Sequence, residues 1–433
     1  MLRLYRILRI LPLIVILAAV AVVSDAMAKT PTIDVLHVKG TVNPVLADYV
    51  ERGIKHAEET GAIACIIQMD TPGGLDTAMR DIIQDILDSD VPIIVYVSPS
   101  GSRAASAGAF ITLAAHVAAM APNTTIGAAH PVAMSSEGEM SAVDEKVVND
   151  AAAYIRTLAE THGRNAEWAE KAVRESVSAT EKEALDQGII EIIASDLDSL
   201  IDQLNGRQVT LLNGQVVTLD TRETIPGDVK MDFSENFLYI ISDPNIAYIL
   251  LSLATLGLIV EISSPGLVFP GVIGGICLLL AFYSLGLLPV NYAGVLLIVL
   301  AFGLFIAEVF TTSFGVLLAG GIVSLVLGSL ILFKGGPLFR VNPWLIAIVV
   351  IIIAGFFIFA IQSVVRAHRR QATTGREDLA GKSAVVKKAL QPEGMVLFRG
   401  ELWSAVSESG PVEAGEEVTI SRVEGLKLYV HKK

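Results

Sequence analysis

Two short segments rich in small residues carry the groups best suited to covalent chemistry. Residues 70–74 read Asp-Thr-Pro-Gly-Gly, and residues 102–108 read Ser-Arg-Ala-Ala-Ser-Ala-Gly. A serine hydroxyl such as that of Ser106 can attack a carbonyl carbon, and backbone N–H groups in a glycine turn or at a helix start can stabilise the oxyanion that forms. Together the two segments would suit nucleophilic acyl transfer.

Either segment alone has a simpler explanation. A Gly-Gly pair most often makes a tight turn between a strand and a helix, and a serine at a helix start most often caps the N–H groups there. Their positions add information, because each segment follows a predicted strand, at 64–69 and at 92–97, and consecutive parallel strands open at one edge of their sheet. We therefore predict that the two loops meet around one carbonyl.

The surrounding pattern is that of an α/β domain. Between residues 31 and 205, β-branched runs alternate with amphipathic stretches, which predicts a parallel sheet with connecting helices. The predicted strands are 33–38, 64–69 and 92–97, and the predicted helices are 47–60, 75–87 and 106–116. Thr180 and Glu183 form a capping-box pattern for a short helix, and a strand is predicted at 189–193. Residues 206–240 look like a weakly structured, β-rich connector.

Composition limits the class of protein. With 433 residues and 52% apolar residues, the chain is too long for one ordinary domain and too apolar to lie wholly in water. Residues 29–235 hold fifteen basic and 32 acidic side chains, which argues against a nucleic-acid surface. The two cysteines, Cys65 and Cys277, fall in predicted buried segments, so no disulfide framework is expected, and no spacing suggests a metal site or a cofactor.

The N-terminus resembles an export signal. Three arginines precede an apolar run at 10–23, and Ala26-Met27-Ala28 matches the small-x-small pattern of a signal-peptide cleavage site. We therefore expect residues 1–28 to be removed. An uncleaved N-terminal anchor is the alternative. Either arrangement exports the α/β domain, whose boundaries we place at 29–240.

A membrane domain is predicted at 241–370. Five apolar stretches near the length of a span lie at 246–262, 269–288, 292–310, 314–333 and 343–365. Five spans would place the C-terminus inside, in agreement with the basic residues 366–370, although Lys334 and Arg340 would then lie outside. Four spans with a re-entrant hairpin would reverse this topology.

The membrane segment contains an internal repeat, and a small domain follows it. Glu261 and Gly274-Gly275 correspond to Glu308 and Gly320-Gly321, which suggests a duplicated pair of helices that pack closely at glycines. We expect the two glutamates to reach the membrane interface.

Residues 376–433 show several short β patterns separated by glycines, typical of a small OB-fold-like barrel, with Trp403 packed in its core or rim.

The paired motifs Thr-Pro-Gly-Gly and Ala-Ala-Ser-Ala-Gly resemble those of the ClpP and signal-peptide-peptidase clan of serine peptidases, which has a crotonase-like fold. With the apolar segments and the barrel, nearly the whole mature chain is similar to the long form of the NfeD family, membrane-bound partners of stomatin-like proteins. The resemblance implies that Ser106 is the nucleophile and that the N–H groups of Gly74 and Ala107 hold the oxyanion. It assigns Lys146, at the start of a helical pattern, as the base.

The identity of the base has two candidates. Lys146 could accept a proton only if its pKa fell from about 10.4 towards neutrality, and the neighbouring Asp144 and Glu145 would oppose that if they faced the same way. His130 is the alternative, because ClpP itself uses a histidine at a similar distance after its serine.

The resemblance implies a membrane-bound serine endopeptidase with a Ser-Lys dyad and no cofactor. Its implied substrate is a hydrophobic segment of a stomatin-like partner, and a homodimer or higher oligomer is expected. The α/β domain would lie on the extracytoplasmic side of the cell membrane and the barrel in the cytoplasm. A non-catalytic scaffold for stomatin- or flotillin-like assemblies is the alternative, whereas acyl-CoA chemistry of the crotonase type is disfavoured by export.

Overall fold

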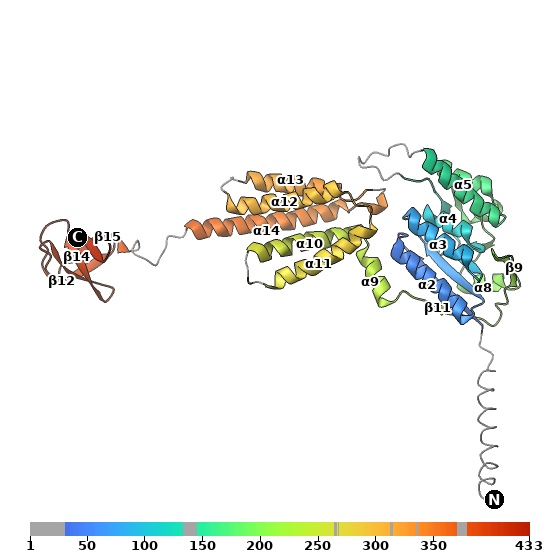
Figure 1. The fold of residues 1–433 in the computed structure, drawn as a ribbon, viewed down its shortest axis with the longest axis horizontal. Helices are drawn as coiled ribbons and strands as arrows, with labels where there is room; N and C mark the ends of the chain where they lie inside the picture. The colour runs from blue at the N-terminus through green and yellow to red at the C-terminus, as the bar shows by residue number, and fades with distance from the viewer. Residues whose placement is uncertain are drawn as a thin grey trace, which may run out of the picture. The chain divides into compact units, whose positions relative to one another are not determined.

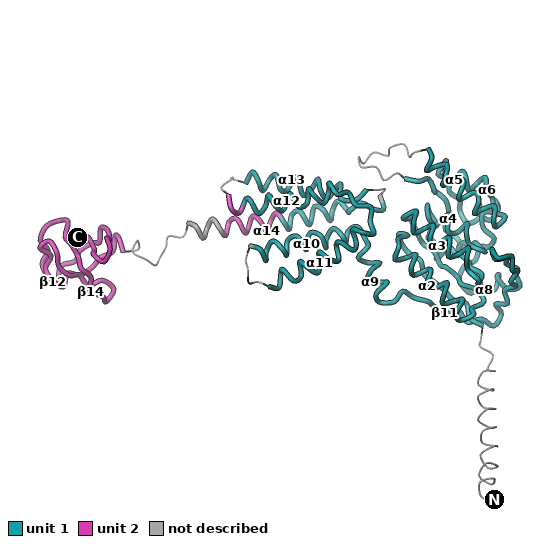
Figure 2. The backbone as a smooth tube through the Cα atoms, in the orientation of Figure 1, with its two compact units in different colours: residues 1–308, 313–353 teal, residues 309–312, 354–433 magenta. Residues whose placement is uncertain are grey.

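The computed structural model describes residues 31–132, 145–263, 266, 268–311, 315–334, 337–369 and 379–433. The predicted signal peptide and Asp144 lie outside these ranges, as do the side chains of the basic residues 366–370. Two compact units divide the chain: Met1–Glu308 with Ser313–Ile353, and Val309–Thr312 with Ala354–Lys433 (Figure 2).

A six-stranded parallel sheet forms the centre of the α/β domain (Figure 1). Its order is β11-β1-β2-β3-β5-β8, built from Ile225–Asp228, Thr32–Lys39, Ala64–Asp70, Ile93–Val97, Val117–Met120 and Ile192–Ile193. The central strands are apolar and buried almost throughout, because structure covers both faces of the sheet.

Helices cover the two faces unequally. On the first face, one hydrophobic core joins the sheet to α2 (Pro44–Thr60), α3 (Asp76–Asp88) and α4 (Ala107–Ala114). Two further helices, α5 (Glu145–Thr161) and α6 (Ala166–Arg174), add to this core beyond α4. The other face packs against α8 (Leu197–Leu204) and the hairpin of β9 (Gln208–Thr210) and β10 (Val216–Thr218). A small sheet of β4 (Arg103–Ala105), β6 (Thr125–Gly127) and β7 (Ser178–Thr180) lies next to the start of α4.

Most of the predicted elements of this domain are confirmed. The predicted strands and helices match β1 to β3 and α2 to α4 within a few residues, and the capping box of Thr180 and Glu183 opens α7 (Glu181–Asp186). The interpretation of residues 206–240 as a loose connector is wrong in its second half. There β11 joins the main sheet beside β1, and Phe233–Ile241 forms the helix α9.

Five apolar helices follow: α10 (Pro244–Ser263), α11 (Val268–Leu287), α12 (Tyr292–Phe310), α13 (Val316–Leu330) and α14 (Pro343–Arg369), with a short 3-10 turn, η1 (Pro337–Phe339), before the last. Four of them are long and apolar enough to cross a bilayer. The exception is α13, whose fifteen residues are fewer than the roughly 20 that a span needs. Five spans therefore stay a prediction.

The internal repeat appears as two helix pairs, α10 with α11 and α12 with α13. A methyl group on Gly274 would lie 2.8 Å from the backbone nitrogen of Leu258 in α10, and one on Gly321 would lie 3.1 Å from the carbonyl oxygen of Ala301 in α12. One glycine of each predicted pair thus allows close packing, while Gly275 faces open space. Glu308 is buried, and its carboxylate accepts hydrogen bonds from the N–H groups of Gly315 and Leu318 at the start of α13; its position at the membrane interface stays a prediction.

The C-terminal domain is a closed five-stranded barrel of order β12-β13-β14-β16-β15. Its strands are Ser383–Lys388, Glu393–Phe398, Glu401–Ser407, Lys427–Lys432 and Glu417–Glu424, in that spatial order. Trp403 is partly buried and packs against the barrel core, as predicted.

Candidate active site

The two glycine- and serine-containing loops lie side by side. Strand β4, just before Ser106, pairs with Thr71: the Thr71 N–H donates to the Arg103 carbonyl at 2.8 Å, and the Ala105 N–H donates to the Thr71 carbonyl at 3.1 Å. The prediction that the loops meet is confirmed. The parallel sheet brings them to one edge, and these two hydrogen bonds hold them together.

Gly73 is in direct contact with Ser106. Its φ is +115°, and a methyl group on it would lie 2.7 Å from Ser106 Cβ and 3.2 Å from Ser106 Oγ. The Thr71 side chain fixes this turn, because its Oγ1 accepts a hydrogen bond from the Gly73 N–H at 3.0 Å. Glycine is required here both by the backbone conformation and by the space that the serine occupies.

Ser106 has an unusual backbone conformation for a serine at a helix start. Its φ is 53° and its ψ is −116°, and its side chain makes no capping hydrogen bond to α4. Within the described residues no hydrogen bond of the Ser106 hydroxyl is found, whereas its N–H donates to the Gly127 carbonyl at 3.0 Å. Such a conformation costs about 1–3 kcal/mol and is typical of functional sites. The simple N-cap explanation of this serine therefore does not hold.

Two backbone N–H groups beside Ser106 are available for an anion. Around Gly74, the Val42 N–H donates to the Gly73 carbonyl and the Leu75 N–H donates to the Val42 carbonyl, both at 2.9 Å. Because these two bonds face Val42, the Gly74 N–H points away from Val42. Ala107 is the first residue of α4, where N–H groups have no partner within the helix. In the part of the chain that the structure describes, neither N–H group has an acceptor.

The far end of α4 is held by an ion pair that the sequence did not reveal. The buried Arg164 binds the Glu191 carboxylate through Nε and Nη2, at 2.8 and 2.9 Å, and its Nη1 donates to the Leu113 carbonyl at 2.7 Å. A cation at a helix C-terminus interacts favourably with the last carbonyls. This pair fixes the helix whose other end carries Ser106.

Lys146 lies in the first turn of α5, where it is exposed. Residues four apart share one face of a helix, so Asp150 and Tyr154 indicate where that face is directed. Asp150 accepts a hydrogen bond from Arg80 of α3 at 2.6 Å, and the Tyr154 ring centre is 6.0 Å from that of Phe110 in α4. The face that carries Lys146 is therefore directed towards α3 and α4.

His130 is half-buried in the loop after β6. Its Nδ1 lies 2.7 Å from the Val173 carbonyl oxygen, and since a carbonyl only accepts, Nδ1 carries the proton and Nε2 is the basic nitrogen. Gly127, three residues earlier, is the residue whose carbonyl binds the Ser106 N–H. Among the described residues neither Lys146 nor His130 forms a hydrogen bond with Ser106, and the choice of base stays a prediction.

Other reactive groups are poorly placed for chemistry. Burial raises the pKa of the Cys65 thiol, and Cys277 is buried within α11. Over the described ranges, no group of three or more His, Cys, Asp or Glu side chains could hold a metal ion.

Three domain families match consecutive parts of the chain: the NfeD1b N-terminal domain at 32–201, the NfeD integral membrane domain at 245–362, and the NfeD-like C-terminal, partner-binding domain at 376–432. The membrane-bound protease PH1510 of Pyrococcus horikoshii is 39% identical over 92% of each chain. The chain belongs to the NfeD family. The sequence-based assignment to this family is confirmed, and so is the fold class of an α/β domain, apolar helices and a small closed barrel.

Two further matches extend the comparison. The membrane protein NfeD1b of Bacillus subtilis is 29% identical over 97% of each chain. A solved structure of a lysine-to-alanine mutant of the 1510-N membrane-bound stomatin-specific protease, in complex with a substrate peptide, is 38% identical; the match covers 49% of this chain and 99% of that one, with a TM-score of 0.47. This NfeD protein is therefore a membrane protein with a protease among its relatives, which supports peptidase activity.

Proposed function

We propose that this NfeD protein is a membrane-bound serine endopeptidase with Ser106 as its nucleophile. The observation that carries the proposal is the strained Ser106 backbone, with a hydroxyl that caps no helix and lies against Gly73. In the described structure the N–H groups of Gly74 and Ala107, the residues directly after Gly73 and Ser106, have no acceptor, which supports the proposal. A serine and two N–H donors around one point are the arrangement that acyl transfer requires.

In the proposed mechanism, Ser106 Oγ attacks the scissile carbonyl while Lys146 accepts the hydroxyl proton. The Gly74 and Ala107 N–H groups donate to the oxyanion of the tetrahedral intermediate. Lys146 then returns the proton to the leaving amine, and water releases the acyl group from Ser106. Removing one donor of such a pair costs a factor of about 10²–10³ in rate, so both N–H groups are needed.

Lys146 must be neutral to act as a base, and its side chain is exposed in the first turn of α5. An apolar substrate that covers the first turn of α5 would exclude water from this amine, and exclusion of water disfavours an ammonium ion. The proposed dyad therefore forms fully only when an apolar segment is bound. This property agrees with the choice of a hydrophobic substrate.

The proposed substrate is a hydrophobic segment of a stomatin-like partner. A relative is described as a stomatin-specific protease with a bound substrate peptide, and the C-terminal domain of this chain matches a partner-binding domain. We propose that the barrel recruits the partner and that the α/β domain, on the extracytoplasmic side, cleaves it.

The test uses the full chain in detergent, incubated with an apolar 20-residue peptide and separately with a fluorophosphonate probe. Wild type should cleave the peptide and be labelled at Ser106, and Ser106→Ala should do neither. Lys146→Ala should lose cleavage, whereas Lys182→Ala, an exposed lysine in the first turn of α7, should retain it. Loss of cleavage with His130→Ala but not with Lys146→Ala would transfer the base to His130. An intact peptide and an unlabelled wild type would favour the scaffold function.

A further inference from the structure

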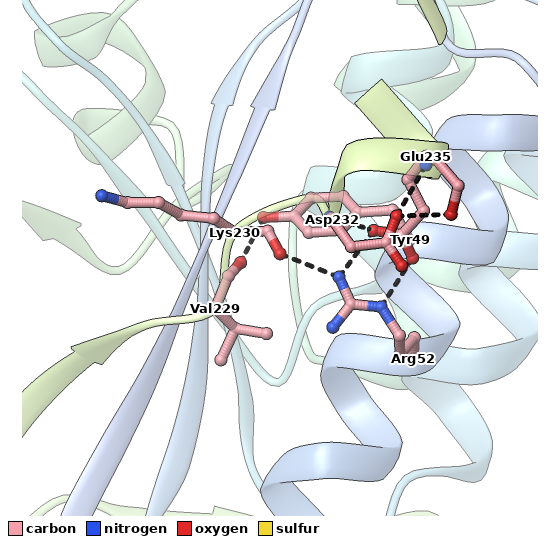
Figure 3. Close-up of polar contacts among 7 residues, drawn as sticks. Tyr49, Arg52, Val229, Lys230, Asp232 and Glu235 are labelled. Atoms are coloured by element: carbon pink, nitrogen blue, oxygen red, sulfur yellow. Dashed lines mark hydrogen bonds and ion pairs between the residues drawn. The ribbon is translucent and has the colours of Figure 1, made fainter. Parts of the chain in front are cut away.

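Helix α9, which leads into the apolar helix α10, is attached to the α/β domain at its first turn. Arg52 of α2 binds the Glu235 carboxylate through Nε and Nη2, at 2.6 and 2.7 Å (Figure 3). Tyr49, one turn earlier on α2, donates its hydroxyl to the Val229 carbonyl at 2.6 Å. These contacts hold the start of α9 against α2.

The last turn of α9 contacts the segment 39–43, which connects β1 to α2. The Tyr239 hydroxyl lies 2.8 Å from the Lys39 carbonyl and 3.4 Å from the Thr41 carbonyl, so its hydrogen is donated mainly to Lys39. A methyl group on Gly40 would lie 2.5 Å from the Tyr239 oxygen, so the two residues touch directly. Tyr239 therefore fixes this segment by both a hydrogen bond and packing.

Ser242, directly after α9, makes a second bond to the same segment. Its Oγ accepts a hydrogen bond from Asn43 Nδ2 at 2.7 Å, and both side chains are buried. Asn43 also caps the first turn of α2 through its Oδ1. The segment is thus held at both of its ends by residues at or after the end of α9.

Segment 39–43 in turn supports the loop that carries Gly74. The Gly40 N–H donates to the Asp70 carbonyl at 2.9 Å, just before the loop, and Val42 exchanges two hydrogen bonds with Gly73 and Leu75. A methyl group on Gly74 would lie only 2.0 Å from the Val42 carbonyl oxygen. Movement of Val42 must therefore displace the Gly74 N–H.

The last residue of α9 is bonded to the apolar helices. Ser284 of α11 is fully buried and donates its hydroxyl to the Ile241 carbonyl at 2.6 Å. A continuous series of contacts therefore runs from α11 through α9 and segment 39–43 to Gly74, all within one compact unit of the chain.

We propose that Tyr239 and Ser242 are positioning residues for the Gly74 N–H, so that the helix entering the membrane domain holds one oxyanion donor in place. This inference rests on the proposed serine peptidase function. A donor displaced by a few tenths of an ångström stabilises the transition state less while the substrate binds equally well, so kcat should fall and KM should not change. We expect a loss in kcat of about tenfold for Tyr239→Phe.

The experiment compares Tyr239→Phe with Tyr96→Phe in the full chain. Tyr96 is the matched control, because it also donates a hydroxyl to a backbone carbonyl, that of Ala194 at 2.9 Å, but packs on the other face of the sheet. Hydrogen–deuterium exchange is measured at the amides of Val42 and Leu75, and peptide cleavage gives kcat and KM. Ser242→Ala serves as a second variant of the same contact.

Faster exchange at both amides and a reduced kcat in Tyr239→Phe and Ser242→Ala, with Tyr96→Phe unchanged, would support the inference. Unchanged exchange in both Tyr239→Phe and Ser242→Ala would overturn it, and so would faster exchange with an unchanged kcat. If wild type proved unlabelled by the probe and inactive, the proposed function would fail. The exchange rates alone would then decide whether α9 holds the loop.

Discussion

Replacing Gly73 by alanine tests the contact on which the proposed site depends. The new methyl group would lie 2.7 Å from Ser106 Cβ and 3.5 Å from the Ala105 carbonyl oxygen. Carbon atoms in contact prefer about 3.5–4.0 Å, so the loop or the serine must move by roughly 1 Å. The φ of +115° adds a backbone cost of about 1–3 kcal/mol for any residue with a side chain.

A displacement of this size should affect catalysis more than stability. Misplacing a reacting group by 1 Å can cost about 10²-fold in rate, so we expect fluorophosphonate labelling of Ser106 to slow by about 100-fold in Gly73→Ala. Gly163→Ala is the control, because Gly163 also has a positive φ, +68°, but nothing lies within 4 Å of its added methyl group. That variant should lose about 1–2 kcal/mol of stability through its backbone alone and keep its labelling rate.

The assay follows labelling with time by gel fluorescence, with the labelled peptide identified by mass spectrometry and thermal unfolding measured in parallel. Wild-type labelling of a folded Gly73→Ala variant would refute the reasoning, because it would mean that the Gly73–Ser106 contact does not control the nucleophile. Equal loss of labelling in both glycine variants would also refute it, since general destabilisation would then explain the effect.

Two predictions concern the far end of α4. Glu191→Gln would leave the buried Arg164 guanidinium without its counter-charge. Breaking a fully buried pair costs about 3–5 kcal/mol, and because the Glu191 side chain is 26% exposed we expect a loss at the lower end of this range. Replacing both residues by methionine should recover much of that loss of unfolding free energy in urea titrations. Burial lowers the pKa of His116 to about 4 and that of His162 to about 3, with Arg164 adding to both shifts, so both imidazoles are neutral in the folded chain. Because the unfolded chain binds these protons near pH 6.5, stability is fully present above that pH and should fall as the pH drops towards 4, by about 1.4 kcal/mol per pH unit for each histidine. His162→Phe should make the melting temperature less dependent on pH over this range, and an unchanged dependence would contradict the assigned shift.

The contact between the loops of Gly73 and Ser106 can be predicted from the sequence, because the order of strands in a parallel sheet determines it. Strands at 64–69 and 92–97 could be recognised from β-branched runs, and parallel strands must open at one edge. The small residues around Gly73 and Ser106 then indicated close approach of backbones. These steps use only local patterns and one rule of fold geometry, so no long-range contact had to be guessed.

The supporting contacts could not be obtained in this way. Arg164 and Glu191 are separated by 27 positions, and Tyr239 reaches Lys39 across 200 positions, so no local pattern links either pair. The prediction of a β-rich connector at 206–240 misses α9, which has only nine residues between a short strand and an apolar run. Tertiary packing against α2 and segment 39–43 stabilises this short helix more than its own propensity does.

The strain at Ser106 indicates why these supports are extensive. A φ of 53° without a capping bond forgoes about 0.5–2 kcal/mol of N-cap stabilisation and adds the cost of the backbone conformation itself. The surroundings offset this: β4 is bonded to Thr71, the Ser106 N–H is bonded to Gly127, and Arg164 is bonded to the last carbonyls of α4. All eight residues of α4 are buried, so the helix cannot shift to relax its first residue. A serine that merely capped a helix would need none of these constraints, whereas a nucleophile held in one orientation needs all of them.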